Sequence, residues 1–119
     1  MNRSRMKPLA SVREASLVLL ERYAAILDDV AFDPPAPDGT SSADLAWMCQ
    51  TAITESAGWP ADKLSRWLGF VQGVMSSRGQ IGVDVEREFS RPLFHAGYVA
   101  AGFVPPASVG RISFTPALS

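Results

Sequence analysis

The sequence predicts an all-α fold, a small bundle of about four helices, on three observations. Apolar residues recur every three or four positions over most of residues 11–102. Serine or aspartate precedes several of these stretches and glycine follows them, as at helix ends. The stretch DPPAPDGT at residues 33–40 interrupts the pattern, because proline cannot continue a helix. We expect a single domain over residues 1–119, with helix 1 at about 11–31, a proline-rich linker at 32–41, a core module at about 42–102 and an extended tail at 103–119.

The first helix begins at Ser11, whose spacing to Glu14 is typical of a capping box. One face of this helix is apolar and predicts the side that packs on the core; it consists of Val12, Ala15, Leu19, Leu20, Tyr23, Ile26, Leu27 and Val30. Acidic residues follow one another at intervals of seven on the opposite side: Glu14, Glu21 and Asp28. This helix is therefore predicted to be amphipathic.

The next two helices flank the segment SAGWP. The second runs from Ser41 or Ser42 to about residue 57, with its buried side formed by Leu45, Met48, Cys49, Ala52 and Ile53. Trp47 points the other way. The third has Pro60 in its first turn and ends at Gly79, and we expect it to be the central helix. Its apolar face comprises Leu64, Trp67, Leu68, Val71, Val74 and Met75.

Two glycines, Gly69 and Gly73, lie inside this third helix on the side opposite its apolar face. Each interior glycine costs about 1 kcal/mol relative to alanine, so an ordinary solvent-facing side does not need them. Their spacing allows the close approach of another backbone. We expect close helix packing there, against another helix of this chain or, as the alternative, against a partner. A phosphate loop is excluded, because no lysine followed by serine or threonine comes after either glycine.

The fourth helix is predicted from an N-cap at Asp84 to about residue 101, with Pro92 either kinking it or beginning a second half. One face carries a polar stripe, Arg87, Arg91, His95 and Tyr98, and the other an apolar set, Val85, Phe89, Ala96 and Ala100. The polar stripe suits a carboxylate-rich protein surface or a phosphate backbone. The alternatives are a solvated face or pairing with the acidic side of the first helix. A short strand is predicted within the tail at Arg111–Phe114.

The amino-acid composition argues against several classes of function, including metal binding, catalysis and membrane insertion. The single cysteine, Cys49, excludes an internal disulfide and falls on an apolar helix face, where a thiol is usually inert. His95 is the one histidine, so no metal site is expected, and no nucleophile stands with a base, so no catalytic residue, cofactor or enzymatic activity is predicted. No long apolar run predicts a membrane span. Residues 23–62 carry seven acidic side chains and no lysine or arginine, so charge is segregated along the chain.

Three segments resemble a known group of proteins: KLSRWLGFVQG from Lys63, VDVER from Val83, and RPLFH from Arg91, together with Tyr98. Over residues 47–98 the chain resembles small uncharacterised proteins encoded by bacteriophages and prophages. That group has no established activity, so the resemblance assigns no functional residue. What it implies is a class: small phage proteins without catalytic groups often bind and block host machinery, including CRISPR and restriction systems.

We therefore expect a non-enzymatic phage-type interaction module in the cytoplasm of a bacterial host, which binds and inhibits a host protein in the manner of an anti-CRISPR protein. Arginine, tryptophan and tyrosine dominate interface energetics. The expected partner-binding residues are Trp47, Trp59, Arg66, Arg87, Arg91, His95 and Tyr98. The alternatives are a nucleic-acid-associated regulator acting through Arg87 and Arg91, which ranks lower because the net charge is −1, and a homo-oligomeric phage assembly or accessory protein, such as a homodimer.

Overall fold

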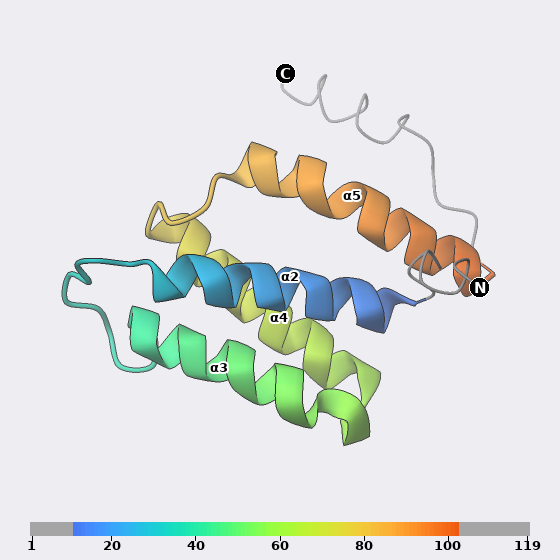
Figure 1. Cartoon of the computed structure of the whole chain (residues 1–119), viewed down its shortest axis with the longest axis horizontal. Coiled ribbons are helices and arrows are strands. Elements are labelled where there is room, and N and C mark those ends of the chain that lie inside the picture. Colours follow the sequence, from blue (N-terminus) through green and yellow to red (C-terminus); the bar gives the residue numbers. More distant parts are fainter. Residues whose placement is uncertain (1–10, 103–119) are drawn as a thin grey trace, which may run out of the picture.

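The computed structural model describes residues 11–102, and the tail and the strand predicted within it lie outside this range. The described residues form a small all-α bundle without strands (Figure 1). Its elements, in chain order, are α2 (Val12–Asp28), α3 (Ser42–Glu55), the short 3-10 helix η1 (Ser56–Gly58), α4 (Ala61–Ser77) and α5 (Val83–Ala100). The predicted fold class is confirmed.

The helix ends follow the local sequence in most places. Ser11 caps α2 by accepting a hydrogen bond from the Glu14 amide at 3.0 Å. Ser41 and Asp44 form a reciprocal capping box at the start of α3. Gly79 follows α4 with φ at +74°, the left-handed conformation that glycine adopts at low cost. The N-cap predicted at Asp84 is wrong: Gly82 occupies that position in α5, which continues through Pro92 as one helix.

The centre of the bundle is α2, not α4 as the glycine pattern suggested. Helix α2 packs against α3, α4 and α5. Helix α5, in contrast, makes extensive contacts with α2 and with no other helix. Figure 1 shows α5 on the side of α2 away from α3. The apolar face predicted for the first helix accounts for this, because the buried core residues are Ala15, Leu19, Leu20, Tyr23 and Leu27 of α2, Leu45, Cys49 and Ala52 of α3, and Leu64, Leu68, Val71 and Met75 of α4.

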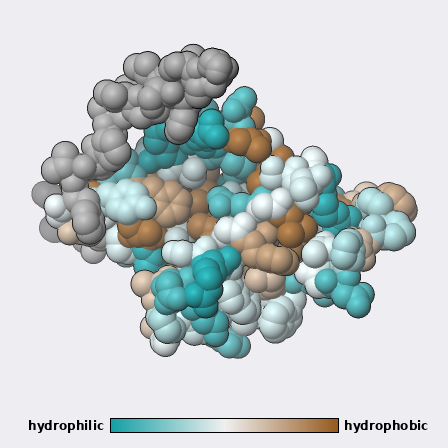
Figure 2. Space-filling model, turned by 180° about the vertical axis from the view of Figure 1, so that it is seen from behind, coloured by the Kyte–Doolittle hydropathy of each residue, from teal (hydrophilic) through white to brown (hydrophobic). Residues whose placement is uncertain are grey.

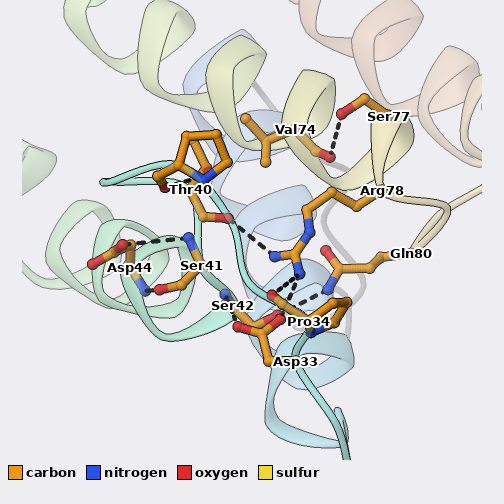
Figure 3. A network of polar contacts seen from close by, with 11 residues as sticks. Asp33, Pro34, Thr40, Ser41, Ser42, Asp44, Val74, Ser77, Arg78 and Gln80 are labelled. Atoms are coloured by element: carbon orange, nitrogen blue, oxygen red, sulfur yellow. Dashed lines mark hydrogen bonds and ion pairs between the residues drawn. The ribbon is translucent and has the colours of Figure 1, made fainter.

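A polar clamp holds the linker between α2 and α3 (Figure 3). The Arg78 guanidinium donates to the Asp33 carboxylate at 2.8 Å and to the Thr40 carbonyl oxygen at 3.0 Å. Asp33 also accepts from the backbone amide of Ser42 at 2.9 Å and from its hydroxyl at 2.6 Å. These hydrogen bonds from Ser42, helped by Arg78, lower the pKa of Asp33. The clamp therefore joins the linker to the first turn of α3 and the last turn of α4.

The crossing of α5 over α2 depends on one glycine. A Cβ atom on Gly97 would lie 2.8 Å from the carbonyl carbon of Ser11 and 2.8 Å from the backbone nitrogen of Val12. The contact is with backbone, so no side-chain rotation can relieve it. Gly97 thus allows α5 to approach the first turn of α2 closely, which is the role that the sequence suggested for Gly69 and Gly73.

Candidate protein-interaction surfaces

All three tryptophans of the chain gather on one surface formed by α3, α4 and the turn between them. The ring centroids of Trp59 and Trp67 are 4.7 Å apart, and those of Trp47 and Trp67 are 6.0 Å apart. The ammonium nitrogen of Lys63 lies 4.1 Å from the centroid of Trp59, in cation–π contact. We call Trp47, Trp59, Lys63 and Trp67 the tryptophan cluster. Exposed and half-buried indole rings of this kind are the side chains that most often anchor protein partners.

The exposure of the cluster is uneven. Trp47 is 63% exposed, as its position opposite the buried face of α3 predicted, whereas Trp59 and Trp67 are half-buried and pack against the core. Phe70, on α4 one turn after Trp67, is 45% exposed. Neither the contact of Lys63 with Trp59 nor the exposure of Phe70 one turn after Trp67 was predicted from the sequence. Their spacing with Trp67, at intervals of four and three, was the available signal, since it places all three along one edge of α4.

The predicted polar stripe on α5 exists, but it does not join the tryptophans. Arg87, Arg91 and His95 are exposed, and Tyr98 is 43% exposed with its ring 6.4 Å from that of Phe94. Within residues 11–102 no ion pair links this stripe to Glu21 or Asp28. The structure therefore separates the predicted partner-binding residues into two groups, with Trp47 and Trp59 in one and the α5 stripe in the other.

Arg66 belongs to neither group. It lies on α4 and pairs with Asp62 one turn earlier, and both side chains are largely exposed. An exposed pair of this geometry contributes little to stability, a few tenths of a kcal/mol. Arg66 therefore lies at the surface, where its guanidinium is paired with Asp62.

The apolar set of α5 is not the main side by which this helix packs on α2. Val85 is 61% exposed and Ala100 is exposed, while Ala96 is half-buried. Phe89 is 38% exposed and touches α2 through Arg22, whose guanidinium carbon lies 4.2 Å from the ring centroid. The side of α5 that meets α2 instead carries Glu86, Ser90, Leu93, Phe94 and Gly97, of which Glu86 and Gly97 are buried. The sequence pattern failed because a glutamate normally stays in water, and here it does not.

Glu86 is buried within a polar network that fixes α5 to α2. Arg22 donates two hydrogen bonds to its carboxylate, at 3.2 and 2.8 Å, and the Tyr23 hydroxyl donates a third at 3.0 Å. Gln72 of α4 in turn donates to the Tyr23 oxygen at 2.9 Å. The Arg22 hydrogen bonds hold the pKa of Glu86 below its ordinary value, and burial raises the pKa of Tyr23 to about 12. Glu86 thus stays charged and Tyr23 stays protonated at neutral pH.

An open cleft of about 270 Å³ lies between α4 and α5, beside this network. It is lined by Gln72, Ser76, Ile81, Val83, Glu86, Arg87 and Ser90. Its one carboxylate, Glu86, is already held by Arg22 and Tyr23. The cleft therefore presents apolar and amide or hydroxyl groups to a ligand, with Arg87 as its cation.

Gly69 and Gly73 do not pack against another helix of this chain. A Cβ atom built at either position has no atom within 4 Å apart from its own helix, and both residues are exposed. The expected internal packing is wrong, because α5 packs along α2 and leaves this side of α4 open. Packing of a partner against these glycines stays a prediction.

This open space gives a direct prediction. Gly73→Ala should raise the free energy of unfolding by about 0.5–1 kcal/mol, because alanine has the higher helix propensity and meets no clash. Urea denaturation followed by circular dichroism measures the change. A loss of stability instead would mean that a neighbouring backbone occupies this side of α4 in solution.

Three further observations bear on the site. Cys49 is fully buried, as predicted, and burial raises the pKa of its thiol to about 11. Among residues 11–102, no cluster of histidine, cysteine or acidic residues is suited to hold a metal ion, and no helix of this part has the length and apolar character needed to cross a membrane. Comparisons of the chain with protein families, with curated proteins and with solved structures find no significant match.

Proposed function

We propose that the protein is a protein-interaction module that docks through the tryptophan cluster. The observation that carries this proposal is the collection of all three tryptophans, beside the 45%-exposed Phe70, on one surface of α3 and α4. Indole rings bury a large area at low entropic cost, so a surface of this kind favours a protein partner. Lys63 adds a cation at its edge, which favours a partner with carboxylates nearby.

The partner is a host protein and binding inhibits it. This step rests on the resemblance of residues 47–98 to small uncharacterised phage-encoded proteins, together with the general tendency of small phage proteins without catalytic groups to block host machinery. The nucleic-acid alternative has less support, because Asp84 and Glu88 accompany Arg87 and Arg91 on the exposed side of α5.

A comparison of two aromatic deletions tests the proposal. Trp47→Ala removes the most exposed ring of the cluster, and Phe32→Ala removes a 77%-exposed ring in the linker. We expect affinity capture from a bacterial lysate to yield a stoichiometric protein whose binding falls at least about ten-fold with Trp47→Ala and stays unchanged with Phe32→Ala. Titrating the purified partner's own activity with each variant then tests inhibition.

Two results would contradict the proposal. One is a partner that both variants retain equally. The other is retention of DNA or RNA alone, with an affinity that falls steeply as salt rises, which would favour the nucleic-acid alternative.

A further inference from the structure

One flank of α5, beside the side that meets α2, carries a row of apolar residues that the bundle leaves partly exposed. Val85, Phe89 and Val99 are 61%, 38% and 53% exposed, Pro92 is exposed and Ala96 is half-buried. Arg22 of α2 covers part of the Phe89 ring, with its guanidinium carbon 4.2 Å from the ring centroid. We call these five residues the α5 seam. The seam lies on the opposite side of α5 from Arg87, which lines the cleft toward α4. A helix normally turns such a row toward a core, so its exposure calls for a second surface to cover it.

The spacing of the seam residues is that of a coiled coil. Their intervals are four, three, four and three, which are the alternating a and d positions of a heptad repeat. Phe89 and Ala96 take the a positions, and Val85, Pro92 and Val99 take the d positions. The run spans most of the 18-residue helix. An α-helix from another molecule therefore fits along it.

The side chains beside the seam favour α5 of a second copy as that helix. Glu88 and His95 occupy the two g positions, and both are exposed. In an antiparallel two-stranded pair, a residues face d residues, so Val85 faces Ala96 and Phe89 faces Pro92 across the interface. The same register sets Glu88 of each copy against His95 of the other, twice by symmetry. Neither side chain makes a hydrogen bond or ion pair with residues 11–102.

We propose that the protein forms a two-fold symmetric homodimer through antiparallel pairing of its α5 seams, with Glu88 and His95 pairing across the interface. A two-fold axis makes the contact self-complementary and closed, so dimers form without extending into filaments. One helix per subunit supplies a small interface compared with the roughly 1,200–2,000 Å² of stable complexes. The dimer therefore dissociates on dilution, with a Kd on the order of micromolar.

Exchanging the charges at positions 88 and 95 of the full chain tests the antiparallel alignment of the two α5 helices. Sedimentation velocity from about 1 µM to about 1 mM should show a monomer–dimer equilibrium. We expect Glu88→Lys to raise the Kd at least about ten-fold, by placing a lysine against His95. The double variant Glu88→Lys/His95→Glu should restore the Kd of the original dimer, because it exchanges the two charges. Glu21→Lys, the same charge change on exposed α2, should leave the Kd unchanged.

A change within the seam tests its apolar part. Val85→Asp should weaken the dimer without unfolding the chain, because Val85 is exposed and an aspartate in the first turn suits the helix dipole. Circular dichroism checks the fold of each variant. A protein that stays monomeric up to about 1 mM overturns the proposal. So does a dimer that both Val85→Asp and Glu88→Lys leave intact, which would place the interface on another surface, such as the tryptophan cluster.

Discussion

Glu86→Ala should lower the free energy of unfolding by about 3 kcal/mol. Glu86 is 7% exposed and accepts hydrogen bonds from Arg22 and Tyr23, so its removal leaves two donors without their partner in a site largely closed to water. Arg22 retains some contact with water, which keeps the cost at the lower end of the range for buried pairs. Urea denaturation measures the change.

Glu21→Ala is the matched control, since it removes the same side chain from an exposed position on α2 that lies outside the α5 seam. We expect a change within about 0.5 kcal/mol for this control. Equal effects of the two variants would show that Glu86 is not buried in the folded protein.

The same carboxylate makes stability depend on pH. Its pKa is lower in the folded protein than the ordinary value of 4.5, because Arg22 stabilises the charged form. The folded state therefore holds fewer protons than the unfolded state, and the contribution of Glu86 is complete above pH 4.5 and is lost as the pH falls through its folded pKa. The free energy of unfolding, measured by denaturation at a series of descending pH values, should fall less steeply for Glu86→Ala than for the unsubstituted protein. The pKa of Asp33 is also lowered, so the stability of both proteins should still decrease to some extent in acid.

Gly97→Ala should lower the free energy of unfolding by about 2 kcal/mol, although alanine is the better helix former. The added methyl group meets the backbone of Ser11 and Val12 at 2.8 Å, so α5 must move away from α2 and lose contacts along the whole crossing. Thermal and urea denaturation of Gly97→Ala beside Gly73→Ala gives a comparison of the same chemical change at two sites. Opposite signs are expected, and stabilisation by both would show that the helices do not cross closely at Gly97.

The sequence predicted those features that depend on neighbours within one helix. The apolar face of the first helix, the burial of Cys49 and the outward direction of Trp47 all follow from periodicity, and the structure confirms each of them. Prediction failed where a distant residue changes the preference of a side chain. The partner of Glu86 is Arg22, 64 positions away, and nothing local to α5 indicates that this glutamate is buried.

The glycines also show that distant contacts cannot be predicted from periodicity within one helix. Periodicity identified Gly69 and Gly73 as positions that permit close approach, but it does not say which helix crosses at which residue. That depends on the orientation of α5, which Glu86 and Gly97 set together. For the same reason the tryptophan cluster was only half predicted, because Trp47 and Trp67 meet through the packing of α3 on α4.

The attachment of α5 to α2 also has a consequence for how the molecule opens. Helices α2, α3 and α4 contact one another, whereas α5 shares extensive contacts with α2 alone. A unit joined at a single face can detach while the remaining helices stay folded, so α5 forms a cooperative opening unit of its own. Its amides should then exchange with deuterium together, at a lower free energy than those of α2 and α3. The fully buried Tyr23 would first meet solvent in this partly open state.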